Sequence, residues 1–181
     1  MKKMKFDSAS AIIRQNINRI DTRRGYIALL RRILITALIV YLFFSRVFMI
    51  MQVKGNTMFP ALKDGDLLIA FRLQNEYMKN DIVVYTAGGE KLVGRLVAKG
   101  GDVVNITESG TLLVNGTAQT EEIVYPTYPV DSLKYPCRVP EGHVFILGDY
   151  RMQAEDSRHI GPVPMDQVKA KVITLLRRRG L

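Results

Sequence analysis

The chain has 181 residues, 48% of them hydrophobic, which is enough for one globular domain with additional segments. Its formal net charge of +9 is concentrated at the start: residues 1–32 hold nine Lys or Arg against two Asp, whereas the remainder holds 17 basic and 15 acidic residues. This balance disfavours a nucleic-acid-binding protein, which would need a basic face on the domain itself. The single Cys137 excludes an internal disulfide.

Residues 1–32 form a basic arm ahead of the longest apolar run. Four isoleucines recur in the arm at helical spacing, at Ile12, Ile13, Ile17 and Ile20. This pattern fits an amphipathic helix on the inner leaflet of a membrane, and it fits a solvated, partly disordered tail equally well. Because Lys and Arg beside a membrane span are retained on the cytoplasmic side, we assign the arm to the cytoplasm.

The apolar run predicts a transmembrane anchor at residues 33–51. Ile33–Phe44 is apolar except for Thr36, but twelve helical residues rise only about 18 Å against roughly 30 Å of hydrocarbon. Counted to Met51, the segment is long enough. A buried core helix does not fit behind the basic arm, and no Ala-x-Ala-like exit follows for cleavage of a signal peptide. We therefore expect one retained span in the cell membrane, with residues 52–181 as an extracellular domain.

The segment directly after the span, Val53–Pro60, combines a glycine, a hydroxyl residue, a bulky apolar pair and a proline. These residues predict a bent path that presents Thr57. On this composition alone, an ordinary β-turn leading into a strand is a better explanation of the segment than a functional site.

The remainder has the pattern of short strands separated by turns. Asn115-Gly116 predicts a type I′ hairpin turn, and the polar, proline-bearing stretch from Thr117 to Pro140 predicts a surface excursion or a small subdomain that contains Cys137. Many short strands with little helix beyond the anchor predict a mainly β domain of packed antiparallel sheets. The expected strands are Leu67–Phe71, Ile82–Tyr85, Lys91–Ala98, Val103–Ile106, Thr111–Val114, His143–Leu147 and Val168–Leu176.

Four stretches, in the same order, resemble the sequence boxes of type I signal peptidases. They are Gly55–Pro60, Asn80–Val84 with asparagine in place of the usual glycine, Val93–Val97 running to Gly101-Asp102, and Gly148–Arg158 running to Gly161–Pro164. The resemblance implies a largely β fold on an outward-facing anchor. It also implies a serine and lysine dyad that cuts leader peptides from exported proteins at the membrane surface.

The chain departs from the family at the dyad itself. A serine hydroxyl needs a base, and a lysine serves as one only when desolvation leaves it neutral. The resemblance places Thr57 at the serine position, Gly94 at the lysine position and Ala154 at the serine that orients the lysine. Threonine keeps the hydroxyl, but glycine removes the base and alanine removes its partner. We therefore expect peptidase activity to be absent or vestigial.

Other residues are weak replacements for the base. Lys91 and Lys99 are odd-numbered, whereas position 94 is even-numbered. In an unbroken strand both lysines therefore point to the face opposite position 94. A bulge at Gly100-Gly101 would turn the Lys99 side chain to the face of position 94. Lys54 lies three residues from Thr57. The two histidines, His143 and His159, are interpreted as ordinary exposed or packed residues.

The remaining boxes imply an intact scaffold. The substrate groove and oxyanion region are expected at Gly55, Asn56, Met58, Pro60, Val93 and Arg95, and the structural support at Asp149, Asp156, Ser157 and Arg158, with an ion pair between Asp156 and Arg158. In the family the substrate lies extended along the box strands, a β-augmentation mode that does not need the dyad.

Two functional classes remain. The first is a noncatalytic, membrane-anchored protein that holds an extended segment of an exported protein. The chain most resembles degenerate Gram-positive signal-peptidase-like proteins associated with pilus assembly, where they act beside sortases on pilins. The second is a working signal peptidase with a Thr57 nucleophile and a relocated base. No metal, cofactor or nucleic acid is expected in either class.

Overall fold

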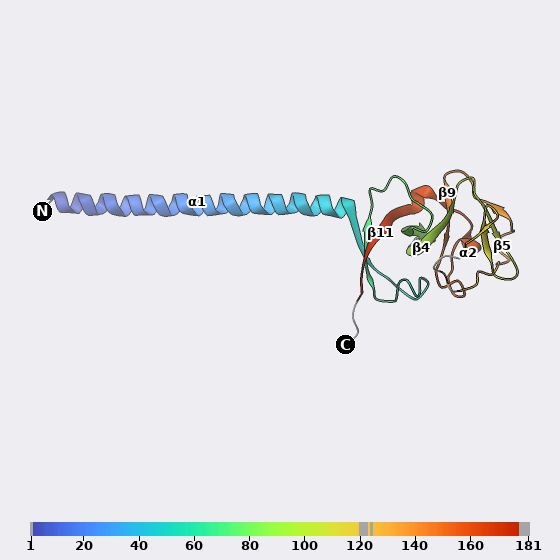
Figure 1. Ribbon diagram of the computed structural model, residues 1–181. Helices are drawn as coiled ribbons and strands as arrows, with labels where there is room; N and C mark the ends of the chain where they lie inside the picture. Colours follow the sequence, from blue (N-terminus) through green and yellow to red (C-terminus); the bar gives the residue numbers. More distant parts are fainter. Residues whose placement is uncertain (1, 120–122, 124, 178–181) are drawn as a thin grey trace. The chain divides into compact units, whose positions relative to one another are not determined.

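The computed structural model describes residues 2–119, 123 and 125–177, with side chains described from residue 23 onward. The chain divides into two units, Met1–Ser45 and Arg46–Leu181. Helix α1 (Lys2–Val47), drawn in blue to cyan in Figure 1, forms the first unit up to Ser45, and its last two residues belong to the second unit. The side chains of the predicted amphipathic arm, at residues 12–20, lie outside the described ones.

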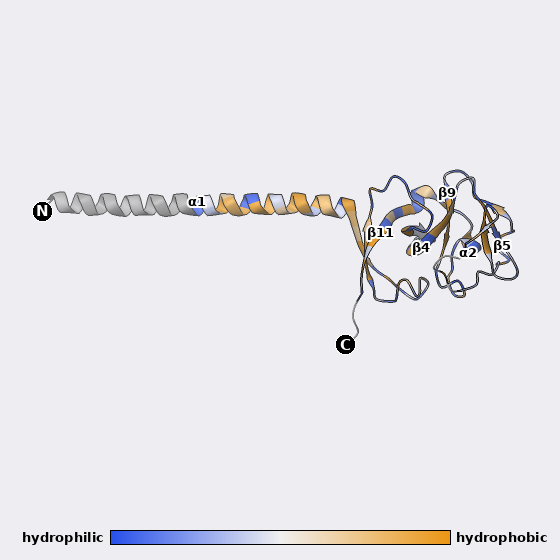
Figure 2. Ribbon diagram, in the orientation of Figure 1, coloured by the Kyte–Doolittle hydropathy of each residue, from blue (hydrophilic) through white to orange (hydrophobic). Residues whose placement is uncertain are grey.

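The second half of α1 contains an apolar run, Ile33–Phe44, that is interrupted only by Thr36. The stretch Arg23–Val47 is long and apolar enough to cross a membrane, and Figure 2 shows it mostly in orange. Its large side chains are uncovered by protein; Leu34 and Tyr41, for example, are 69% and 68% exposed. A long helix with an apolar run on all its faces and no protein cover is typical of a lipid-facing span, which supports the predicted anchor.

The helix ends earlier than the predicted anchor, which ran to residue 51. Strand β1 (Phe48–Gln52) follows α1 directly and pairs with β2 (Leu67–Phe71) in antiparallel register. Met49 is buried against the domain core. Hydrophobicity alone predicted one continuous span because the last part of the apolar run is a core strand, and a core strand and a membrane helix share the same composition.

The domain is built on a seven-stranded antiparallel sheet. Its order is β1-β2-β11-β3-β4-β9-β10. Every neighbouring pair is antiparallel, and each strand predicted for this sheet is present, which confirms the mainly β fold. The further strands are β3 (Ile82–Ala87), β4 (Glu90–Lys99), β9 (His143–Leu147), β10 (Val163–Pro164) and β11 (Val168–Leu176).

A second, four-stranded antiparallel sheet has the order β7-β6-β5-β8. Asn115 and Gly116 both have positive φ, 53° and 80°, as the predicted type I′ turn between β6 and β7 requires. The stretch predicted to be an irregular excursion supplies two short strands of this sheet. The four strands are β5 (Val103–Ile106), β6 (Leu112–Val114), β7 (Thr117–Ala118) and β8 (Cys137–Arg138).

The alternation of β9 divides the core between two layers. Phe145 and Leu147 pack with the second sheet, whereas Val144 and Ile146 pack on the opposite face with residues of β3 and β4. Two short helices, α2 (Ser157–Ile160) and the 3-10 turn η1 (Met165–Gln167), follow β9 along the chain. Because β9 is buried on both faces, the loop that leaves it at Gly148 starts from a fixed point.

Candidate functional site

Thr57 lies on a turn whose path is held by its own polar and apolar contacts. Gly55, at φ 75°, donates its N–H to Asp64 Oδ1 at 2.7 Å, and Phe59 donates to the carbonyl of Asn56 at 3.0 Å. Met58 is fully buried in a cluster with residues of β2. The turn therefore places the half-buried Thr57 at the surface.

The end of β9 brings Thr57 and Ala154 together. The carbonyl of Thr57 accepts a hydrogen bond from the N–H of Tyr150 at 2.9 Å. A Cβ atom added to Gly148 would lie 2.3 Å from Ala154 Cβ and 2.7 Å from the Thr57 carbonyl oxygen. These contacts leave no room for a side chain at position 148, so the two segments meet at that glycine.

Gly94 lies on β4, beside β9, and its missing side chain would point into packed protein. A Cβ atom added there would lie 2.4 Å from Ile146 Cγ2, 3.2 Å from Tyr85 Cε1 and 3.3 Å from the carbonyl oxygen of Leu147. Ile146 is fully buried, and Tyr85 is 2% exposed. The base position therefore lacks a lysine and also lacks the space in which its stem would begin.

Tyr85 cannot replace the lysine as a general base. Burial, reinforced by the negative charge of Asp156, raises the pKa of its phenol well above the usual 10. The phenol therefore stays protonated and neutral at pH 7, so it cannot accept the proton of the Thr57 hydroxyl.

A groove of about 570 Å³ runs beside Thr57, between the end of β1 and the start of β4. Among the described residues, Val93 is the one predicted groove residue, apart from Thr57 itself, that borders it. The side chains of Met58, a core residue, and of Arg95 are buried and do not border it. Gly55 and Asn56 shape the turn, and Pro60 is exposed. The groove is lined by Met51, Gln52, Val53, Lys54, Thr57, Glu90, Lys91, Leu92 and Val93.

Lys91 borders the groove together with its strand neighbours Glu90, Leu92 and Val93. Its predicted orientation away from the face of position 94 does not remove it from the groove, because residues from both faces of β4 line it. Lys54 borders the groove as well. Both lysines are exposed, so neither has the burial through which a lysine becomes a base.

Lys99 is separated from this region by a break in strand register between Leu96 and Ala98, earlier than the predicted bulge at residues 100–101. Among the described residues, neither His143 nor His159 borders the groove. The described side chains contain no group of three or more His, Cys, Asp or Glu that is suited to a metal ion.

Two strand edges open toward the groove. Leu96 exchanges hydrogen bonds with residues 80 and 81 on the β3 side, so by alternation the main-chain groups of Val93 and Lys91 point to the other side. There β9 ends at Leu147, opposite Arg95. Directly after β1, Val53 forms main-chain hydrogen bonds with residues 65 and 66, so by alternation the main-chain groups of Gln52 and Lys54 point to the other side. An extended peptide between these edges would find main-chain partners on both sides.

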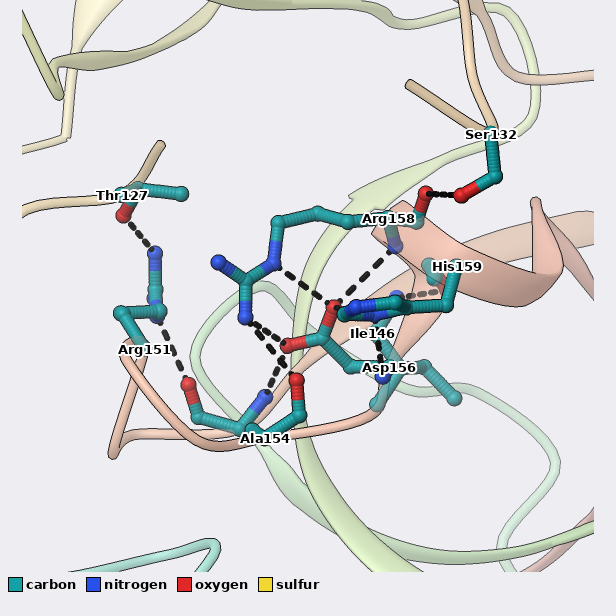
Figure 3. A network of polar contacts seen from close by, with 10 residues as sticks. Thr127, Ser132, Ile146, Arg151, Ala154, Asp156, Arg158 and His159 are labelled. Carbon is teal, nitrogen blue, oxygen red and sulfur yellow. Dashed lines mark hydrogen bonds and ion pairs between the residues drawn. The ribbon is translucent and has the colours of Figure 1, made fainter. Parts of the chain in front are cut away.

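The loop after β9 is supported by the predicted ion pair, shown in Figure 3. Arg158 donates from Nε and Nη2 to the Asp156 carboxylate at 2.8 and 2.9 Å, and both residues are buried. Asp156 also accepts from the N–H of Gly148 at 3.0 Å. Ser157 Oγ accepts from the N–H of Ile146 at 3.0 Å. The predicted supports thus fix the residues that pack against positions 94 and 154.

A second buried ion pair escaped sequence reasoning. Arg95 donates two hydrogen bonds of 2.8 Å to the Asp149 carboxylate, 54 residues away. Arg151, two residues after Asp149, donates to the carbonyl of Gly148 at 2.7 Å and to Thr127 Oγ1 at 2.6 Å (Figure 3). Burial lowers the pKa of Arg151 to about 10. The arginines therefore serve the scaffold, and no local signal pairs residue 95 with residue 149.

Comparison with known proteins agrees with this geometry. Residues 26–176 match the family model described as Signal peptidase, peptidase S26. Signal peptidase I of Bacillus caldolyticus is 32% identical over 136 residues, which are 66% of this chain and 74% of that protein. Probable thylakoidal processing peptidase 2 of Arabidopsis thaliana is 35% identical over 130 residues, 65% of this chain.

The match spans only 35% and 40% of the lengths of two thylakoidal processing peptidases from Arabidopsis thaliana. Among solved structures, a signal peptidase I from Enterococcus faecalis V583 is 24% identical. The matched region covers 55% of this chain and 98% of the solved chain, with a TM-score of 0.47.

Proposed function

Because the chain belongs to the peptidase S26 family of signal peptidases, we propose that it is a membrane-anchored member that binds an extended segment of an exported protein without cutting it. The observation that carries this proposal is the environment of Gly94. A hydroxyl at Thr57 needs a base, and the space for the family's lysine is taken by Ile146 at 2.4 Å from the Cβ position.

The groove supports retention of binding. Its floor contains apolar side chains of Met51, Val53 and Val93, and the strand edges on both sides offer main-chain donors and acceptors. Peptides that add as a strand gain affinity from main-chain hydrogen bonds and specificity from alternate side-chain pockets. None of these contacts requires a dyad.

The biological setting follows from the resemblance and from the charge of the arm. The nine basic residues before position 33 support a cytoplasmic N-terminus and a domain outside the cell membrane. The degenerate Gram-positive relatives support pilins as the exported proteins and a sortase-type machinery as the neighbour. In this role the protein acts as a chaperone-like assembly factor.

The test uses the full-length protein in detergent micelles. We expect no cleavage of a fluorogenic signal-peptide substrate above the level of the Thr57→Ala variant. We expect the uncleaved peptide to bind, measured by fluorescence anisotropy, and a matched peptide with N-methylated backbone amides to lose that binding. Thr57-dependent turnover would refute the noncatalytic role, and equal binding of the N-methylated peptide would refute the strand-addition mode.

A second function, a peptidase with Thr57 as nucleophile, is favoured by one observation: Lys54 and Lys91 border the same groove as Thr57. In that case one of them would serve as the relocated base. Cleavage lost in Thr57→Ala and in Lys54→Gln or Lys91→Gln would establish it.

A further inference from the structure

Two lysines border the groove, one on each wall. Lys54 follows β1 and Lys91 lies on β4, and both are exposed. Within the described part of the chain, neither forms an ion pair, whereas Lys79 and Lys171 pair with aspartates at 3.2 and 2.7 Å. Glu90 is the one carboxylate among the described lining residues, so the groove carries a net positive charge of one.

The floor between the walls has a different character. Val53 is 3% exposed, and Met51 and Val93 are half-buried. In an extended peptide, successive side chains point to opposite faces. Residues that face the floor would then contact methyl and thioether groups, while those between them would point outward to the charged rim.

We propose that the groove selects an extended segment in which apolar residues alternate with an acidic residue, the acidic side chain lying between Lys54 and Lys91. This proposal rests on the proposed peptide-binding function and adds the chemistry of the partner. Asp or Glu is the side chain that complements two ammonium groups, and a Lys at the same position would be repelled by both.

The size of the effect follows from exposure. Two unit charges 4 Å apart in water interact by about 1 kcal/mol, and exposed pairs are weakened by salt. The acidic residue should therefore improve affinity by about threefold to tenfold, and the improvement should shrink as salt is raised. Apolar contacts and main-chain hydrogen bonds would persist in high salt.

The test uses the full-length protein in detergent micelles and three fluorescent peptides. Each peptide consists of Ala and Val except for one central residue, which is Asp, Asn or Lys. This central residue occupies the position that would point to the charged rim of the groove. We expect the Asp peptide to bind about threefold to tenfold more tightly than the Asn peptide in 50 mM salt, and the Lys peptide to bind most weakly. The difference should fall in 500 mM salt.

Variants locate the effect. Lys54→Gln and Lys91→Gln should each reduce the ratio of Asp-peptide affinity to Asn-peptide affinity. Lys134→Gln, at an exposed lysine outside the groove, should keep the preference. Equal binding of the Asp and Asn peptides would overturn the acidic preference and leave the proposed function standing. Absence of binding by all three peptides would overturn both.

Discussion

The Cγ2 methyl of Ile146 lies 2.4 Å from the point where a side chain at Gly94 would begin. Contacts this short force one group to move, and Ile146 is both fully buried and stiff at χ1 because it is β-branched. The carbonyl of Leu147, at 3.3 Å, adds a backbone limit. Loss of the lysine is thus accompanied by closure of its space.

The first prediction concerns stability. Gly94→Ala should lower the free energy of unfolding by about 1–3 kcal/mol, since it overpacks a filled core. Ile146→Leu removes the branching methyl and should cost less than about 1.5 kcal/mol. In the double variant the losses should be less than additive, as measured by chemical denaturation. Strict additivity would show that the two residues do not compete for space.

The second prediction concerns restoration of the dyad. The triple variant Thr57→Ser, Gly94→Lys, Ala154→Ser carries the family's residues at all three positions, yet we expect it to cleave a signal-peptide substrate no faster than the unaltered chain. Adding Ile146→Ala should open the space and yield measurable cleavage. Turnover by the triple variant alone would show that Ile146 is not an obstacle.

The third prediction compares two ion pairs. Arg95→Met leaves the Asp149 carboxylate buried without its bidentate partner and should destabilise the domain by about 3–5 kcal/mol. Lys79→Gln removes a pair whose lysine side chain is 44% exposed and should cost at most about 1 kcal/mol. Thermal and urea unfolding of both variants measure the contrast. Similar losses would mean that the buried pair is not a main support of the loop after β9.

The fourth prediction concerns Tyr135, whose buried hydroxyl has no hydrogen-bond partner among the described residues. Tyr135→Phe should be neutral or stabilising by about 1 kcal/mol at pH 7, because it removes an unpaired polar atom. Tyr128→Phe, at a side chain that is 45% exposed, is the control and should change little.

The same residue gives a pH dependence. Burial raises the pKa of Tyr135 to about 12, above the value near 10 of an unfolded tyrosine. As pH rises, the unfolded chain therefore loses this proton before the folded chain does. The contribution of Tyr135 to the free energy of unfolding is fully present below pH 10 and falls as pH rises toward 12. The fall should be smaller in Tyr135→Phe than in Tyr128→Phe. An identical alkaline profile in the two variants would contradict this role.

Local patterns in the sequence were sufficient for much of the fold. Short β-rich runs bounded by turn residues predicted β2, β3, β4, β5, β6, β9 and β11, because residues a few positions apart decide where a strand begins and ends. The Asn115-Gly116 turn followed from the need for positive φ at both residues. The ordered boxes predicted the family, which the match over residues 26–176 confirms.

The tertiary structure decided what depends on residues distant in sequence. It showed that Phe48–Gln52 is a core strand, since only pairing with β2 distinguishes it from the end of a membrane span. It assigned Arg95 to Asp149 rather than to the groove, and it placed Lys91 beside Thr57. It also showed that position 94 is closed by Ile146. The sequence alone reveals which side chain is missing, whereas the space that side chain would need depends on how the neighbouring strand packs.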